Sequence, residues 1–191
     1  MTRPATEHRH SGNLSPEFAL LGLLIAGPDH GYNLYQRMVR DLGHVWHLSQ
    51  SQSYAILKRL ENRADISVRL VEQHKLPDRQ MLRITAQGRR RFMEWLKKGS
   101  AENARGVRLE FLTRLYFSEL YTPKDTRRIF TAQFSGLTRN IGRLVTLLHR
   151  VPPEQTYNRL SLELRLRQLK VIKTWMAEAR NQFLIEKELP S

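Results

Sequence analysis

Apolar residues recur at helical spacing over the first third of the chain and predict three successive helices. Residues 18–26 are apolar nearly all round, so we expect a buried central helix that ends at Gly27-Pro28. Residues 30–43 and 49–63 are amphipathic at the 3.6-residue period. Their inner faces consist of Leu34, Tyr35, Met38 and Leu42 in the first helix and of Ser53, Leu57, Leu60 and Ala64 in the second. Two such helices joined by a short turn predict a helix-turn-helix.

The period changes from 3.6 to two residues after the third helix. Apolar and polar residues alternate over residues 66–70 and again over residues 81–84, which predicts two short β-strands. The connecting loop is basic and contains a proline. A fourth helix is expected after Thr85, with Phe92, Trp95 and Leu96 inside. A hairpin with a basic tip after a helix-turn-helix is typical of a wing that contacts DNA. A plain solvated loop is the alternative.

The C-terminal half predicts long paired helices. After an amphipathic segment at residues 107–120, residues 123–150 carry apolar side chains at steps of 4, 3, 4, 3 and 4, which is a coiled-coil spacing. This seam consists of Phe130, Phe134, Leu137, Ile141, Leu144 and Leu148. Its partner is either another helix of the same chain or a second subunit.

The last predicted helix, residues 155–187, has two apolar stripes. The second stripe consists of Tyr157, Leu160, Leu164, Val171 and Trp175. One neighbouring helix cannot cover two stripes on so long a helix, so we expect a homodimer. We assign the dimer contact to the first stripe, which consists of Leu162, Leu166, Leu169, Ile172, Met176 and Phe183.

These elements predict a mainly α protein. We expect a disordered tail over residues 1–13 and an N-terminal winged helix-turn-helix domain with a small two-stranded wing over residues 14–98. A linker over residues 99–106 would lead to a C-terminal helical dimerisation domain over residues 107–189.

The charge of the chain favours a polyanionic partner. The 191 residues carry a formal net charge of +14. Residues 1–48 are neutral overall, whereas residues 49–98 hold twelve basic and five acidic residues, a net +7. Residues 99–191 hold sixteen against nine, also a net +7 but over nearly twice the length. The charge per residue is therefore nearly twice as dense in residues 49–98, which hold the predicted third helix, wing and fourth helix, as in the C-terminal half.

The outer face of the third helix has small and amide side chains near its start and cations further along. It suits a helix that enters the DNA major groove by its N-terminus, with Gln52 on base edges and Lys58 or Arg59 on phosphates. An ordinary solvated face is the alternative. The predicted contacts to double-stranded DNA are Ser49, Ser51, Gln52, Tyr54, Ala55, Lys58 and Arg59 on the helix, and His74, Lys75 and Arg79 on the wing.

Other function classes lack support in the sequence. No nucleophile–base pair, paired carboxylates or glycine-rich phosphate loop is recognisable, so we expect neither an enzyme nor a cofactor. His8 and His10 have no carboxylate cluster around them, so we expect no metal site. The longest apolar run is far shorter than the ~20 residues of a membrane helix. The absence of cysteine fits a protein of the reducing cytoplasm.

Several segments, in consistent order, resemble the PadR family of bacterial transcriptional regulators. They are ALLGLL at 19–24, GPDHGYNL at 27–34, Tyr54 with LKRLE at 57–61, ITAQGR at 84–89, and Trp95-Leu96. RLEFLTRLYF at 108–117 also resembles the longer PadR subgroup. The resemblance implies a winged helix-turn-helix repressor, of a kind that responds in several members to phenolic acids or drugs. It also implies a homodimer on a pseudo-palindromic operator.

The chain departs from the family pattern at three places. The family usually has Gly-Leu-Ile before the wing, where this chain has Ala64-Asp65-Ile66. Without the glycine, we expect the left-handed residue that ends the third helix at Asn62 or Asp65. Leu82 replaces a usual tyrosine, and the small residues before Tyr54, which usually include glycine, are SQS.

Two further hypotheses follow. Trp46, Tyr157 and Trp175 are candidates for a pocket that binds a small aromatic effector, although aromatic residues at helical spacing are more often plain core. The departures from the family pattern also leave an alternative function, a winged-helix adaptor that binds proteins and does not read DNA.

Overall fold

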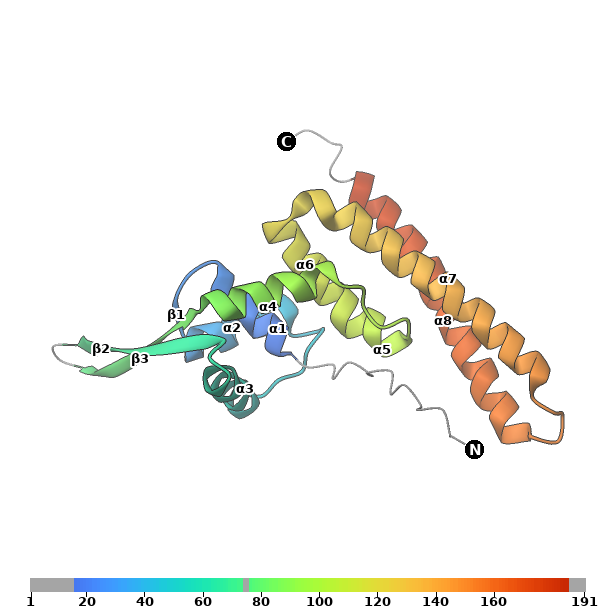
Figure 1. The fold of residues 1–191 in the computed structure, drawn as a ribbon, viewed down its shortest axis with the longest axis horizontal. Coiled ribbons are helices and arrows are strands. Elements are labelled where there is room, and N and C mark those ends of the chain that lie inside the picture. The colour runs from blue at the N-terminus through green and yellow to red at the C-terminus, as the bar shows by residue number, and fades with distance from the viewer. Residues whose placement is uncertain (1–15, 74–75, 186–191) are drawn as a thin grey trace, which may run out of the picture.

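The computed structural model describes residues 16–73 and 76–185, with the side chains of residues 71–79, 182, 184 and 185 left out. Figure 1 shows the helices of the N-terminal half and a hairpin at one end of the molecule, and two long antiparallel helices at the other. The helix α6 lies between them. The prediction of a mainly helical protein with a small antiparallel sheet is therefore confirmed.

All four predicted helices of the N-terminal half are present. They are α1 (Glu17–Ile25), α2 (Gly31–Leu42), α3 (Gln50–Asn62) and α4 (Ala86–Lys97). As its all-round apolar sequence predicted, α1 is buried over most of its length and lies at the centre of the core. The inner faces of α2 and α3 match the predicted stripes, except that Tyr35 is only partly buried, Ala64 is exposed and Ile56 is buried.

The wing belongs to a sheet of three strands. The long strands β2 (Ile66–Gln73) and β3 (Leu76–Ile84) form the predicted hairpin, with Val68 opposite Leu82. The third strand, β1 (Asp29–His30), pairs with β3 in the order β1-β3-β2. Because β1 has only two residues, no alternation in the sequence could reveal it.

The N-terminal core extends beyond the predicted domain boundary. Leu109 and Phe117, from the segment assigned to the dimerisation domain, belong to the same cluster as α1. A Cβ on Gly22 would lie 2.4 Å from the Phe117 ring, so only glycine allows this contact. Trp46 also crosses the boundary, since its indole donates to Thr113 Oγ1 at 2.8 Å. The segment around α6 thus completes the winged-helix core.

The C-terminal half begins inside the predicted linker. Gln133 and Asn140 donate side-chain hydrogen bonds to the backbone carbonyls of Ala101 and Glu102 at 3.3 Å and 2.5 Å, so this segment is fixed against the seventh helix. The elements in chain order are α5 (Ala104–Gly106), a π-helical segment (Val107–Phe111), α6 (Leu112–Tyr121), a 3₁₀ turn (Pro123–Asp125), α7 (Thr126–Arg150) and α8 (Thr156–Ile185).

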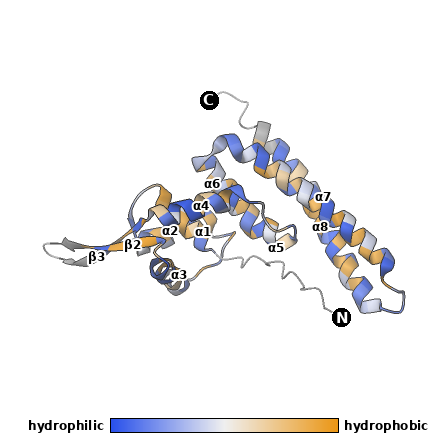
Figure 2. Ribbon diagram, in the orientation of Figure 1, coloured by the Kyte–Doolittle hydropathy of each residue, from blue (hydrophilic) through white to orange (hydrophobic). Residues whose placement is uncertain are grey.

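The coiled-coil seam of α7 pairs with α8 of the same chain, which settles the alternative left open by the sequence. Figure 2 shows apolar positions alternating with polar ones along both helices, as this pairing requires. We had assigned the first stripe of α8 to a dimer contact, and this pairing corrects the assignment, because the stripe packs against α7 of the same chain. All six residues pack in the cluster with α7: Leu162, Leu166, Leu169, Ile172, Met176 and Phe183.

The second stripe of α8 is the one left exposed. Tyr157, Leu160, Leu164, Val171 and Trp175 are all among the exposed large apolar residues of the described chain. The two stripes were correctly predicted. The spacing within one helix does not reveal which of the two stripes packs against the hairpin partner, α7.

Candidate nucleic-acid interface

The helix α3 presents a polar face to solvent. Ser49 caps the helix through a hydrogen bond that its side chain accepts from the Gln52 N–H at 3.2 Å. Ser53, Ile56, Leu57 and Leu60 are buried beneath the helix. The predicted DNA contacts on α3 are all exposed: Ser49, Ser51, Gln52, Tyr54, Ala55, Lys58 and Arg59.

Gln52 has a structural task in the free protein that the sequence analysis did not assign. Its Oε1 accepts a hydrogen bond from the Ser49 backbone N–H at 2.9 Å, which completes a capping box with the Ser49 side chain. The amide NH₂ group remains the natural donor toward a base. A bidentate contact with adenine would also use the carbonyl oxygen, which would then accept a second hydrogen bond beside that of the capping box.

The two cations expected on phosphates form ion pairs in the free protein. Lys58 Nζ lies 2.9 Å from Glu61 Oε2, one turn further along α3. Arg59 Nε lies 3.5 Å from Glu17 Oε1 on α1. Both basic side chains remain at least half exposed, so each retains surface for a second, anionic partner.

A groove of about 610 Å³ runs between α3 and the sheet. Tyr54 lines it, and a Cβ on Gly31 would lie 2.8 Å from the Cε1 atom of this tyrosine. The ring of Tyr54 therefore packs directly on the backbone at the start of α2. Tyr32, Asn33, Lys58, Glu61 and Gln80 supply polar groups along the same groove.

The tip of the wing is only partly described. His74 and Lys75 lie outside the described residues. The backbone of Arg79 lies in β3 opposite Val71, whereas its side chain also lies outside the described part. The predicted wing contacts therefore remain predictions.

The end of α3 corrects one expectation. The left-handed residue is Ala64 itself, with φ of 56°, and neither Asn62 nor Asp65. The Asp65 N–H donates to the Leu60 carbonyl at 2.9 Å and the Ala64 N–H to the Glu61 carbonyl at 2.8 Å, which is a Schellman motif. The alanine thus occupies the place of the family's glycine.

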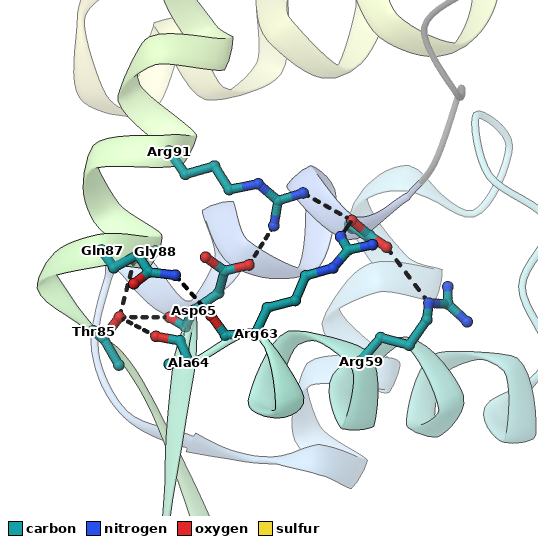
Figure 3. Close-up of polar contacts among 9 residues, drawn as sticks. Arg59, Arg63, Ala64, Asp65, Thr85, Gln87, Gly88 and Arg91 are labelled. Atoms are coloured by element: carbon teal, nitrogen blue, oxygen red, sulfur yellow. Dashed lines mark hydrogen bonds and ion pairs between the residues drawn. The ribbon is translucent and has the colours of Figure 1, made fainter.

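The start of α4 fixes this turn (Figure 3). The Thr85 hydroxyl donates to the Ala64 carbonyl at 2.7 Å, and the Gln87 side chain donates to the Arg63 carbonyl at 2.7 Å. A Cβ on Gly88 would lie 2.1 Å from the Asp65 carbonyl oxygen, so α4 and the turn are in direct backbone contact. These contacts with α4 therefore fix the turn that connects α3 to the wing.

Charged residues from α1, α3 and α4 meet beside this turn (Figure 3). Glu17 Oε2 lies 2.8 Å from Arg63 Nη1 and 3.1 Å from Arg91 Nη2. Arg91 also pairs with Asp65, which is almost fully buried. Arg91 therefore has a structural role, because it joins α4 to the acids of α1 and of the turn. The sequence signal for this cluster was an acid at the head of a helix that is otherwise apolar.

Comparison with known proteins agrees with this geometry. Residues 20–94 match the sequence profile of the PadR-like transcriptional regulator family. Over these residues the chain is similar to a family of transcriptional regulators, which is the family whose resemblance the sequence analysis described.

The chain is similar to two curated PadR-like relatives. It is 27% identical over 117 residues to the negative transcriptional regulator PadR of Bacillus subtilis, which covers 61% of this chain and 64% of the relative. It is 31% identical over 78 residues to a probable transcriptional regulator of Mycobacterium tuberculosis, covering 41% of each. The chain thus matches less than two thirds of the length of either relative.

Two crystal structures of B. subtilis PadR are also similar. The complex with operator DNA is 23% identical, with 85% of this chain and 94% of that chain covered and a TM-score of 0.44. The complex with p-coumaric acid is 24% identical, with 86% and 92% covered and a TM-score of 0.40.

The three residues predicted for an effector pocket of this PadR-like chain do not come together. Trp46 is buried in the N-terminal core, and Tyr157 is 86% exposed near the start of α8. Of the three residues, Trp175 lines a cavity of about 530 Å³. Arg105, Arg108 and other residues between α5 and α8 line the same cavity.

Two expected absences can be examined only within residues 16–73 and 76–185. Over that part of the chain, no group of three or more potential ligands is placed to hold a metal ion. Within the same described ranges, no helix has the length and hydropathy needed to cross a membrane.

Proposed function

We propose that this chain is a dimeric, sequence-specific DNA-binding repressor in which α3 enters the major groove and the wing contacts the adjacent backbone. The observation that carries the proposal is the outer face of α3. It is uncovered along its length, begins with a capped N-terminus, and changes from hydroxyl and amide groups to cations toward its end. Short polar groups followed by cations fit base edges and then phosphates.

Similarity to the PadR-like family supports the same function. The matched residues 20–94 include the whole of α3 and the hairpin. The relative from B. subtilis is a negative regulator and has been crystallised on operator DNA. We extend both properties to this chain as a proposal.

The exposed stripe of α8 supports the dimer. Leu160, Leu164, Val171 and Trp175 repeat at near-heptad spacing on a face that is exposed in the described chain. Contiguous apolar surface of this kind marks an interface in a protein free of membrane spans among its described helices. The two-fold axis of such a dimer would place two α3 helices on successive major grooves of a pseudo-palindromic site.

A small aromatic acid is the proposed effector class. The cavity at Trp175 is largely apolar and has Arg105 and Arg108 beside it, which fits an aromatic ring that carries a carboxylate. The cavity shares Trp175 with the exposed stripe, so a second copy would lie next to it. The B. subtilis relative has been crystallised with p-coumaric acid, a compound of this class.

The function is tested by measuring binding of the full chain to its own upstream DNA and to a random duplex of equal length at physiological salt. We expect binding to the upstream duplex to be at least about a thousandfold tighter. Equal affinity for both duplexes would exclude specific reading and favour the adaptor. In the same assay, p-coumaric acid is expected to release the specific complex, and retention of the complex would remove this acid from the effector class.

A further inference from the structure

Glu17 is a shielded acid beside the recognition helix. Its side chain is only 9% exposed, at the first turn of a helix that is otherwise apolar. Its carboxylate contacts Arg59 on α3, Arg63 at the end of α3, and Arg91 on α4. The acid thus touches both cations on one flank of the recognition helix.

Arg59 forms an ion pair with Glu17 at 3.5 Å, Arg63 is hydrogen-bonded to the same carboxylate at 2.8 Å, and both side chains are otherwise open to solvent. Their side chains are 51% and 52% exposed, whereas the carboxylate between them is screened from water and salt ions by the protein. Arg59 uses Nε toward Glu17, which leaves its two terminal amino groups for another anion. Arg63 uses Nη1 and keeps its remaining donors in the same way.

Arg91 pairs with two carboxylates of the cluster, those of Glu17 and Asp65. Because Arg91 is occupied by Asp65 and Glu17 together, it anchors the carboxylate of Glu17 from the side away from α3. Glu17 is therefore a fixed point to which the two flank cations are tied.

We propose that Glu17 determines DNA specificity by tying Arg59 and Arg63 to fixed positions on the flank of α3. This inference rests on the proposed function. Phosphate contacts carry no sequence information by themselves, and a freely moving arginine finds a phosphate in any register of the helix on DNA. A tied arginine reaches a phosphate only where the duplex is docked in one register. The ion pairs with Glu17 therefore make the phosphate contacts of Arg59 and Arg63 favour the one register in which α3 also contacts its bases.

The opposite role for Glu17 makes the opposite prediction. If the acid merely holds the arginines up toward phosphates in every complex, its removal weakens binding to all DNA alike. If the acid restrains them, its removal strengthens binding to random DNA and lowers the ratio of specific to random affinity. The sign of the change on random DNA therefore separates the two roles.

The test compares wild type with Glu17→Gln, which keeps the shape of the side chain and removes its charge. Fluorescence anisotropy is measured on a labelled random duplex and on a duplex selected from a random pool, over a series of salt concentrations. On random DNA we expect tighter binding at low salt and a logarithmic salt slope steeper by about one, equal to one further phosphate contact. The specificity ratio at low salt should fall by about threefold to tenfold, because random DNA gains a phosphate contact that the selected duplex already has.

Two controls identify the path of the effect. Glu154→Gln removes the charge of an exposed acid in the turn between α7 and α8 and should leave the specificity ratio unchanged, which accounts for net charge alone. In a background of Arg59→Gln with Arg63→Gln, Glu17→Gln should no longer alter the ratio or the slope. An unchanged ratio in the single variant, or an equal change in the double-arginine background, would overturn the proposal.

The double-arginine variant also serves if Glu17→Gln does not fold, as judged by circular dichroism. With Glu17 intact, the proposal predicts that loss of both arginines weakens binding to the selected duplex more than binding to random DNA. An equal loss on both would overturn it. Failure of the proposed function is distinguishable, because wild type would then show no preference for any selected duplex.

Discussion

Ala64 shows at the scale of one residue what the sequence revealed and what it hid. The departure from the family's glycine was visible in the sequence, and so was the need for a left-handed residue near the end of α3. The predicted position was wrong, because we assigned the left-handed conformation to Asn62 or Asp65, whose side chains tolerate it better than alanine does. In the structure, the contacts of Thr85 and Gly88 fix the turn and leave the strain on Ala64.

Ala64→Gly is expected to stabilise the fold. An L-residue in the left-handed region costs about 1–2 kcal/mol, and glycine avoids this cost while losing part of the gain through the entropy of the unfolded chain. We expect the free energy of unfolding in urea to rise by about 0.5–1 kcal/mol. Ala132→Gly, at an exposed position inside α7, is the matched control and should lower it by about 1 kcal/mol. A decrease for both variants would contradict the strain at Ala64.

At the scale of the element, α3 was the best predicted part of the site. Its helical period correctly placed Ser53, Leu57 and Leu60 inside and the candidate contacts outside. The ion-pair partners of the exposed side chains could not be predicted from the sequence, because they lie far away along the chain. Arg59 meets an acid 42 positions earlier, and no pattern within α3 contains that information.

Gln52 should affect stability and DNA binding separately. Gln52→Ala removes the acceptor of the Ser49 N–H bond, so we expect a loss of about 0.5–1 kcal/mol in the free energy of unfolding. Gln52→Glu keeps an acceptor at the same place and adds a charge that favours a helix N-terminus, so its stability should equal or exceed that of wild type. Its affinity for DNA should nevertheless fall, because a carboxylate would face the phosphates and acceptor-rich bases.

The measurements are urea denaturation and anisotropy on the selected duplex. If Gln52→Glu is as unstable as Gln52→Ala, the capping box does not stabilise α3 in solution. If Gln52→Glu binds DNA like wild type, the residue does not lie at the DNA surface.

At the scale of the whole molecule, the two halves are joined more closely than the sequence indicated. The predicted linker is fixed to α7, and α6 contributes to the N-terminal core. A polar contact adds to this junction, since the Tyr116 hydroxyl on α6 donates to Asp41 Oδ2 on α2 at 2.8 Å. Composition predicted a boundary near residue 99, whereas packing across that boundary depends on shapes that composition does not encode.

This junction should be sensitive to alkaline pH. Burial, with the hydrogen bond to Asp41, raises the pKa of Tyr116 to about 12 from the usual value near 10. Since the folded protein retains the phenol proton longer than the unfolded chain, the contribution of Tyr116 is complete below pH 10 and is lost as the pH rises toward 12. Tyr116→Phe should therefore lose less stability than wild type between pH 10 and 12 in urea denaturation. Equal losses would show that Tyr116 does not titrate with folding.

The exposed stripe of α8 gives the last prediction. Leu164→Glu with Val171→Glu places charges on that stripe without touching the cluster that joins α7 to α8. We expect these variants to fold and to change from a dimer of about 45 kDa, twice the chain mass of 22.5 kDa, to a monomer in light scattering. Because two half-sites are then bound separately, affinity for the selected duplex should fall far more than affinity for random DNA.

Two further variants decide which surface forms the dimer. Leu147→Glu changes an exposed leucine on α7 and should leave the dimer intact. Leu162→Glu changes the buried stripe that we first assigned to the interface, and it should unfold the helical hairpin because the charge would be buried against α7. A folded monomer from Leu162→Glu would indicate that the first stripe forms the interface. A dimer that persists in the variant with Leu164→Glu and Val171→Glu would exclude the exposed stripe of α8. The stripe that is exposed in one chain is a surface that a two-fold partner can cover, whereas the stripe that we first assigned to the dimer is already covered by α7.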